Sequence, residues 1–157
     1  MKKLIQKLVK EQKIIKTEPS KNIFLSYNKK AENSLKAAKI LLKQELMEES
    51  ITMSYYSMYH KATALLRLTG IKCENHNATI HILKEIFCLD INSISIAKTE
   101  RTETQYYTNS KIKKSDVINS ITKAEYFIQE IDLFTDSLNE DKRREYLKKF
   151  KEQYKVL

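Results

Sequence analysis

Glycine and proline are nearly absent from this chain, which has Gly70 and Pro19 as single examples among its 157 residues. Tight turns between neighbouring β-strands depend on glycine, so short β-hairpins are not expected. Charged residues make up 31% and hydrophobic residues 41% of the sequence, which is typical of a soluble helical protein. No apolar run approaches the ~20 residues that a membrane-spanning helix needs. The sequence therefore predicts an all-α protein of one domain, long enough to bury a core.

The clearest helical pattern lies in residues 50–76. Apolar and aromatic side chains recur there at the spacing of one helix face: Ile51, Tyr55, Met58, Ala62, Leu65 and Leu66. This stripe predicts a helix packed into a core, and Gly70 stands where the stripe stops, as a helix-ending glycine does. A second line, rotated by one residue, carries polar and ionisable groups: Tyr56, His60, Thr63 and Arg67. Buried polar groups need partners, so this line predicts either a functional site or structural hydrogen bonds.

Further helices are expected on both sides of this segment. Residues 1–16 have the pattern of a basic amphipathic helix that stops before Pro19, and we expect it to pack on the flank of the domain rather than on RNA or lipid. Helices over 21–46 and 48–69 are joined so tightly that they should be antiparallel neighbours. The remaining elements are a polar loop at 71–78, a helix capped by Asn77, a helix starting near Asn92 or Ser93, and a long helix capped by Ser115.

These elements predict an up-and-down four-helix bundle over residues 21–138, flanked by a basic N-terminal extension at 1–20 and a basic C-terminal helix at 139–157. The last segment places Tyr146, Phe150 and Tyr154 at helical spacing among lysines. It could bind RNA through a basic aromatic surface, cap a dimer, or cover the core with its aromatic side chains. The sequence leaves these alternatives open.

Three stretches, in this order and spacing, resemble the HEPN families. The first is Lys29 to Ala38. The second is the run Ser-Tyr-Tyr-Ser-Met-Tyr-His-Lys-Ala at 54–62, followed by Ala64-Leu65-Leu66, Gly70-Ile71 and His76. The third is Arg-Thr-Glu-Thr-Gln-Tyr-Tyr at 101–107, which is similar to an Arg-x-x-x-Asp-Tyr element of one HEPN branch. The resemblance covers residues 22–138 and implies a HEPN-like helical bundle.

The resemblance also implies a candidate catalytic element. HEPN proteins that cut RNA carry an arginine, then four to six residues, then a histidine, and two copies of this element face each other across a homodimer. The expected chemistry does not need a metal. The arginine stabilises the charged transition state and the histidine moves the proton of the 2′-hydroxyl. Here Arg101 is present, but Tyr106 stands at the histidine position, and a phenol with a pKa of ~10 is a poor base. Ribonuclease activity should therefore be weak or absent, and whether the chain is an enzyme stays open.

The candidate site residues follow from this comparison. Arg101 and Tyr106 are the candidate catalytic pair, and Glu103, Tyr107, His60 and Arg67 are candidate substrate-binding residues. His60 could instead be a structural histidine bonded across the core, and Tyr106 with Tyr107 could simply anchor the end of a helix. His76 is expected to serve in a loop or cap.

Charge and the resemblance together suggest partners. The net charge of +9, from 29 Lys and Arg against 20 Asp and Glu, favours RNA or an acidic protein, unless it reflects compositional bias alone. The resemblance implies a homodimer paired with a minimal nucleotidyltransferase in a toxin–antitoxin or defence module. The alternative is a non-catalytic dimerisation and docking module for that partner.

No metal, cofactor or membrane is expected. Cys73, His76, His81 and Cys88 do not have the spacing of a common zinc site. The amino terminus is interrupted by lysine too often to be a signal peptide, so a cytoplasmic location is expected.

Overall fold

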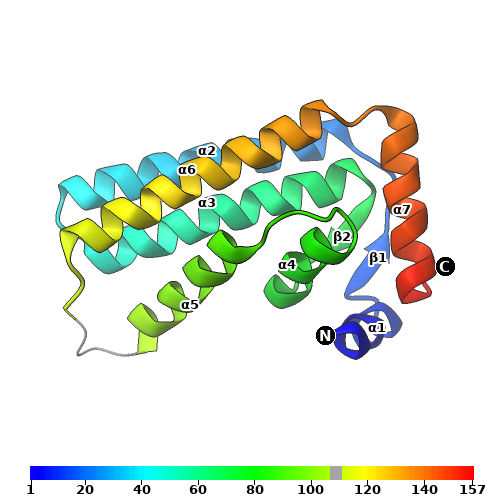
Figure 1. Ribbon diagram of the computed structural model, residues 1–157, viewed down its shortest axis with the longest axis horizontal. Coiled ribbons are helices and arrows are strands. Elements are labelled where there is room, and N and C mark those ends of the chain that lie inside the picture. The colour runs from blue at the N-terminus through cyan, green and yellow to red at the C-terminus, as the bar shows by residue number, and fades with distance from the viewer. Residues whose placement is uncertain (107–110) are drawn as a thin grey trace.

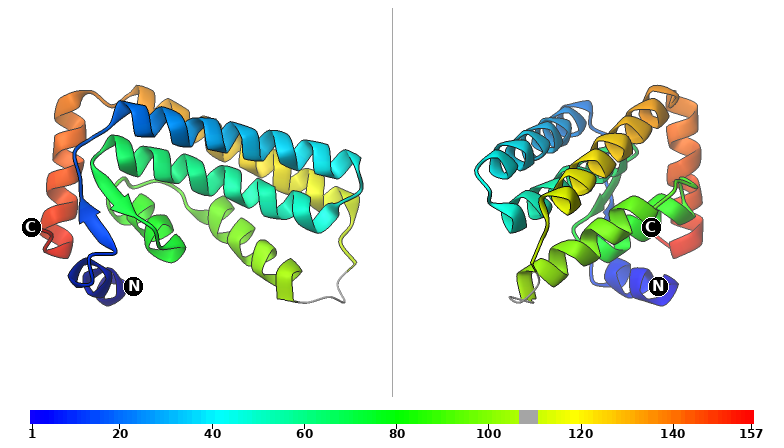
Figure 2. Two further views of the ribbon diagram at one scale, coloured as in Figure 1. Left: turned by 180° about the vertical axis from the view of Figure 1, so that it is seen from behind. Right: turned by 60° about the vertical axis from the view of Figure 1, so that its left-hand side comes forward.

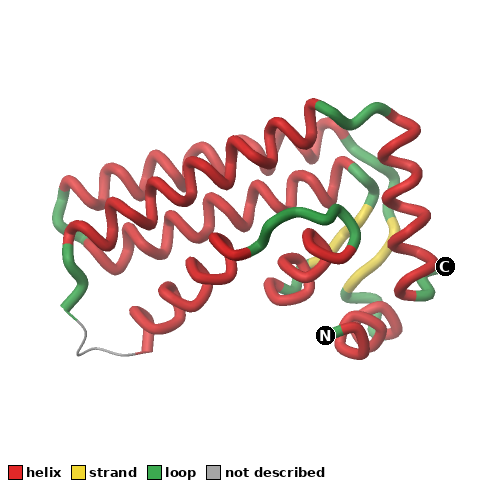
Figure 3. Tube along the Cα trace, in the orientation of Figure 1, coloured by secondary structure: helices red, strands yellow, loops and turns green. Residues whose placement is uncertain are grey.

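The computed structural model describes residues 1–106 and 111–157 of the chain, and its described part is almost entirely helical (Figures 1 and 3). The long helices are α2 (Lys21–Lys43), α3 (Met47–Leu68) and α6 (Lys114–Asp136); the shorter ones are α1 (Lys2–Lys10), α4 (His76–Glu85), α5 (Asn92–Tyr106) and α7 (Glu140–Tyr154). Two short strands, β1 (Ile14–Lys16) and β2 (Ile71–Cys73), complete the elements. The all-α fold class is confirmed.

Helix α3 is the centre of the bundle. It runs alongside α2 and α6, which also contact each other, and α5 packs against α3 from another side (Figures 1 and 2). The six residues of the predicted apolar stripe on α3 are all buried. Buried Lys61 of the same helix donates to Asn28 Oδ1 on α2 at 2.8 Å and pairs with Asp132 on α6. Hydrophobic burial and one shared cation thus hold the three long helices together.

The helix starts differ from two of the predicted caps. Asn75, not Asn77, caps α4, and its Oδ1 accepts from the amide of Ala78 at 2.9 Å. α6 begins one residue before the predicted cap, with Lys113 as the N-cap residue, and the Asp116 carboxylate accepts from the Lys113 amide at 3.1 Å. In both places a side-chain oxygen accepts a hydrogen bond from a backbone amide three residues away, and this bond sets where the helix begins.

The two strands were not predicted. The predicted helix over residues 1–16 is wrong beyond Lys10. The predicted loop at 71–78 is wrong for its first three residues, which form β2, and for its last three, which begin α4. β1 pairs with β2 in antiparallel register, with Ile14 opposite Cys73 and Lys16 opposite Ile71. No hairpin turn is needed because α2 and α3 lie between the strands in the sequence.

Gly70 makes the end of this pairing possible. Its backbone has φ +83°, its carbonyl accepts from the Thr17 amide at 2.8 Å, and a Cβ at this position would lie 2.7 Å from the Thr17 carbonyl oxygen. A residue with a side chain would meet both the steric cost of the left-handed conformation and a backbone clash. The single glycine therefore ends α3, as predicted, and admits the N-terminal segment beside it.

Helices α1 and α7 pack on each other at one end of the bundle (Figure 1). Ile5 and Leu8 of α1 belong to the same buried cluster as Phe150 and Tyr154 of α7, which are 0% and 1% exposed. Of the three roles considered for the C-terminal aromatic residues, Phe150 and Tyr154 therefore have the role of covering the core. Among the described residues, no helix combines the length and apolar character needed to cross a membrane.

Candidate functional site

Four residues of α3 form an aromatic surface where α3 faces α4 and α5. Tyr55 and Tyr59 lie one turn apart, and Tyr56 and His60 repeat this spacing one residue further along. The rings of Tyr55 and Tyr59 are stacked with centroids 6.2 Å apart, and those of Tyr56 and His60 are stacked at 5.9 Å. The pairs meet because residues four apart lie above each other on a helix.

Arg101 of α5 reaches across to this surface. Its Nη2 donates to the Tyr56 hydroxyl at 3.1 Å. The guanidinium carbon lies 5.1 Å from the Tyr56 ring centre and 5.7 Å from that of Tyr55, distances at which a cation is attracted to an aromatic face. The Arg101 Nε is buried and has no protein partner. One edge of the guanidinium is thus held by tyrosine, while Nε remains without a partner.

His76, the first residue of α4, joins the same surface from a third element. Its Nδ1 lies 2.6 Å from the Tyr55 hydroxyl, and its ring stacks on Tyr59 with centroids 3.9 Å apart and planes 9° apart. Burial raises the pKa of the Tyr55 phenol, so the hydroxyl keeps its proton and donates it to Nδ1. In the neutral imidazole the proton then sits on Nε2.

The two histidines are poised to be neutral. Burial lowers the pKa of His76, and nearby Arg101 and Lys98 lower it further. Burial also lowers the pKa of His60, with Lys30 adding to the effect. Desolvation and neighbouring cations both disfavour a second positive charge. At neutral pH the positive charge of the site is therefore carried by arginine and lysine.

We call Tyr55, Tyr56, Tyr59, His60, His76 and Arg101 the Arg101 cluster. It offers a guanidinium suited to a phosphate, phenol and imidazole groups that can donate hydrogen bonds, and aromatic faces. His76 is less suited to removing a proton, because its Nδ1 accepts from Tyr55 and its Nε2 then carries the proton. The tautomer of His60 is not fixed through Nδ1, which is buried without a partner. The arrangement favours binding an anion over rapid proton transfer.

The structure brings together only some of the residues proposed from the sequence. Arg101 and His60 both contact Tyr56. Glu103 is exposed on another face of α5 and lines a hollow with Lys111 and Ser120 instead. Two residues along a helix correspond to a turn of about 200°, which places Glu103 away from Arg101.

Arg67 also lies apart from the cluster, seven residues beyond His60 on α3. Its Nε is buried without a hydrogen-bond partner, and among the described residues no hydrogen bond joins it to Arg101. The Tyr106 side chain and all of Tyr107 lie outside the described residues, so the candidate pair of Arg101 and Tyr106 is not described.

Sequence reasoning missed His76, Tyr55 and Tyr59 as members of the site. His76 was placed in a loop or cap role, yet it starts α4 and makes the closest ring contact of the cluster. The available signal was the Tyr55 and Tyr59 pair, which indicates a flat aromatic surface able to receive another ring. Among the described residues, no group of three or more His, Cys, Asp or Glu side chains is close enough to hold a metal ion.

Comparison with known proteins identifies the family. The HEPN domain matches this chain over residues 26–140. The chain belongs to the HEPN family. This match includes α3, α4 and α5, and hence every member of the Arg101 cluster of this HEPN protein.

The chain is also similar to individual proteins from several organisms. A UPF0332 protein of Pyrococcus horikoshii is 36% identical over 91 residues, which are 58% of this chain and 60% of that protein. A candidate toxin of Methanocaldococcus jannaschii is 28% identical over 107 residues, 64% of this chain and 80% of that protein. A UPF0332 protein of Archaeoglobus fulgidus is 29% identical over 107 residues, 64% of this chain and 86% of that protein. The match thus spans less than two thirds of the length of the Pyrococcus protein.

Proposed function

We propose that this HEPN protein binds RNA and contacts a phosphate through Arg101, with weak or no cleavage of the bound strand. The observation that carries the proposal is the position of the half-buried Arg101 guanidinium, which donates to the Tyr56 hydroxyl at 3.1 Å and lies beside the rings of Tyr55 and Tyr56. A guanidinium held in this way can form a charge-assisted hydrogen bond to a phosphate. Because the side chain is already ordered, binding costs less conformational entropy.

The same geometry supports weak cleavage. Removing the proton of a 2′-hydroxyl requires an accepting nitrogen within reach of the RNA. His76 accepts from Tyr55 through Nδ1, so its Nε2 carries the proton, and the buried Nδ1 of His60 has no partner that would orient this ring as a base. The protein is therefore expected to bind phosphate through Arg101 while lacking an efficient general base, and its residual cleavage should not need a metal.

A second function is favoured by one observation. The contacts of Arg101 with Tyr55 and Tyr56 tie α5 to α3, which also suits a purely structural arginine. In that case the chain is a non-catalytic dimerisation and docking module for a nucleotidyltransferase. An arginine that only ties helices together would contribute to stability and not to RNA affinity.

The assembly belongs to the same proposal. Three apolar side chains at near-heptad spacing on α6, Ile118, Tyr126 and Leu133, are 47%, 66% and 73% exposed, which supports a homodimer formed through this face. The resemblance to nucleotidyltransferase-paired HEPN proteins, together with the candidate toxin among the relatives, supports a cytoplasmic toxin–antitoxin or defence module. Light scattering that gives only the 18.5 kDa species would reject the dimer.

The deciding experiment compares RNA affinity of three variants. Fluorescence anisotropy with a labelled single-stranded RNA, in buffer with a metal chelator, is measured for Arg101→Ala, Arg101→Lys and the control Lys36→Ala. Lys36 is exposed on α2, so its substitution removes one positive charge away from the Arg101 cluster. Loss of a charge-assisted hydrogen bond should weaken binding about tenfold or more for Arg101→Ala, less for Arg101→Lys, and little for the control.

The alternative gives a different pattern. If Arg101→Ala keeps the affinity of the wild type while its melting temperature falls, the arginine is structural and the docking module is the better description. Gel analysis of the same RNA after incubation measures cleavage. Rapid cleavage by the wild type that His60→Ala abolishes would contradict the proposed lack of a general base.

A further inference from the structure

The positive charge of the protein is concentrated in its two terminal segments. Residues 1–16 and 140–157 together hold thirteen lysines and arginines against five acidic residues. The longer stretch between them, 17–139, holds sixteen against fifteen and is close to neutral. The net charge of +9 therefore belongs almost entirely to α1, β1 and α7 with their flanking residues.

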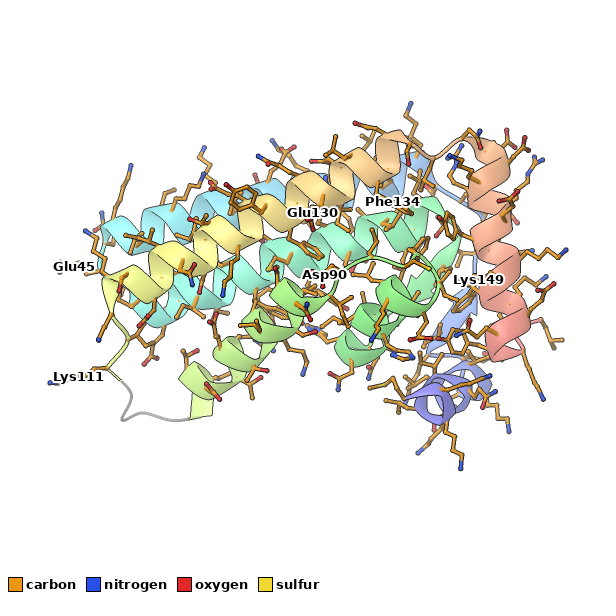
Figure 4. The ribbon with its side chains drawn as sticks, in the orientation of Figure 1. Glu45, Asp90, Lys111, Glu130, Phe134 and Lys149 are labelled. Atoms are coloured by element: carbon orange, nitrogen blue, oxygen red, sulfur yellow. The ribbon has the colours of Figure 1, made fainter. Side chains whose placement is uncertain are left out.

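The fold brings these segments together. The N- and C-termini lie at the same end of the molecule, where α7 stands beside β1 and above α1 (Figures 1 and 2). Lys149 of α7 is at this end, whereas Glu45 and Lys111 mark the opposite end (Figure 4). Segments that are far apart in the sequence thus form one basic region, and the basic composition is a local property of this surface.

Within this region the cations follow one face of α7. Arg144, Lys148, Lys151 and the C-cap residue Lys155 are spaced by four, three and four residues, which places the helical ones on the same side. Lys16 of β1 shares a hollow with Arg144, Lys148 and Lys151 around Leu147, and Glu152 is the one acidic residue that lines it.

A second hollow lies between α1 and α7, where Lys10 lines it together with Tyr154 and Lys155. The two hollows adjoin different parts of α7, and basic residues outnumber acidic ones in the lining of both. We define the terminal basic surface by the basic residues that line them: Lys10, Lys16, Arg144, Lys148, Lys151 and Lys155.

Few of these charges are neutralised within the chain. Arg144 pairs with Glu140 and Asp141, and Lys148 lies 3.9 Å from Glu152. All of these pairs are exposed to solvent, and such pairs are weak and easily exchanged. In the described structure, Lys10, Lys16, Lys151 and Lys155 form no ion pair. The surface is therefore free to meet an external anion.

The chemistry of this surface favours a phosphate backbone over a lipid or a protein. Membrane binding by an amphipathic helix uses its apolar face, but Ile5 and Leu8 of α1 are buried in the core. The centre of a protein–protein interface is typically apolar and depleted in charge, whereas the hollow around Leu147 is lined by four cations and one carboxylate, Glu152. Flexible lysines that form no ion pair, such as Lys16 and Lys151, suit the phosphates of a nucleic acid.

We infer that the terminal basic surface is a second RNA contact, which binds the phosphate backbone separately from the Arg101 cluster. This inference rests on the proposed function in taking RNA as the polyanion. The surface supplies most of the attraction for the strand, while the cluster contributes a single guanidinium. Binding at the terminal basic surface is independent of sequence, because phosphate contacts carry no base information.

The test separates the two sites by charge-matched variants. The terminal variant is Lys16→Gln/Lys148→Gln/Lys151→Gln. Its control, Lys36→Gln/Lys43→Gln/Lys114→Gln, removes three exposed lysines from α2 and α6. Arg101→Ala is measured in parallel. Affinity for a labelled single-stranded RNA is followed by anisotropy between 50 and 200 mM salt, and circular dichroism melting verifies that each variant is folded.

Three lost phosphate contacts should make the slope of log affinity against log salt shallower by about 2, because each contact on a single strand contributes about 0.7. Wild-type affinity should then fall about 20-fold more than that of the terminal variant over this salt range. The control should keep the wild-type slope.

Each other outcome overturns a different statement. Equal losses in the terminal variant and the control mean that only net charge matters, and no terminal surface exists. An unchanged terminal variant together with a large loss for Arg101→Ala rejects the terminal surface and leaves the proposed function standing. A large loss for the terminal variant with no change for Arg101→Ala rejects only the proposed contact between Arg101 and RNA. If labelled poly-glutamate binds as tightly as RNA and with the same loss in the terminal variant, the surface takes an acidic polypeptide instead.

Discussion

Arg101→Ala and Tyr56→Phe, alone and combined, measure what the contact between α5 and α3 contributes to stability. Tyr56→Phe keeps the aromatic ring and removes only the hydroxyl that accepts from Arg101 Nη2 at 3.1 Å. Arg101→Ala removes the hydrogen bond and the approach of the guanidinium to the rings of Tyr55 and Tyr56. The double variant therefore separates the hydrogen bond from the ring contacts.

The contacts set the expected size of each effect. A hydrogen bond to a charged group contributes about 1.5–3 kcal/mol, and we expect the lower part of this range because Arg101 is only half-buried. Each cation–ring contact at a partly exposed site adds about 0.5–1 kcal/mol. Arg101→Ala should then cost about 2.5–3.5 kcal/mol, which lowers the melting temperature of a chain of this size by about 5–14 °C.

Urea unfolding followed by circular dichroism gives the free energies. Tyr56→Phe should cost about 1.5 kcal/mol, and the double variant should cost about 1.5 kcal/mol less than the sum of the single changes, because the bond can be lost only once. If the effects of the two changes add within about 0.3 kcal/mol, the bond does not contribute in solution and the reasoning fails.

Three further predictions concern the fold and pH. Gly70→Ala should cost about 2 kcal/mol or more in urea unfolding, because φ is +83° and the new Cβ would lie 2.7 Å from the Thr17 carbonyl oxygen; a neutral result would mean that β1 is not held there. The pKa values of His60 and His76 are lowered in the folded chain, so the unfolded chain binds more protons below pH ~6.5. The free energy of unfolding should therefore fall as the pH drops, by at most about 1.4 kcal/mol per histidine and pH unit. A His76→Gln variant whose stability has the same pH slope as the wild type would contradict this for His76. Phe150→Ala should cost about 3–5 kcal/mol because the side chain is 0% exposed, whereas a melting curve like that of the wild type would show that α7 is not packed on the core.

The sequence predicted the parts of the fold that depend on local periodicity. The apolar stripe on α3 repeats through several turns, so its buried face followed from spacing alone. The pairing of β1 with β2 left no such signal, because Ile14 and Cys73 are 59 positions apart and three-residue strands are too short for a visible alternation. The basic pattern of α1 continued into residues 11–16 and concealed the strand.

The sequence also predicted only part of the candidate site. Tyr56 and His60 share a helix face, and Arg101 could be singled out because the HEPN resemblance marked its position. His76 comes from α4, and only the tertiary fold places it on Tyr59. Glu103 was grouped with Arg101 because they are close in sequence, although a separation of two residues turns side chains to different sides of a helix.

The contact between α1 and α7 joins two helices that lie far apart in the sequence, which has a consequence during synthesis. A ribosome adds about 5–20 residues per second, so Ile5 and Leu8 are made about 7–30 s before Phe150 and Tyr154. Until then the apolar face of α1 lacks its partner on the nascent chain. This end of the molecule can therefore close only after α7 has been synthesised, and α1 is the segment that a chaperone would meet in the meantime.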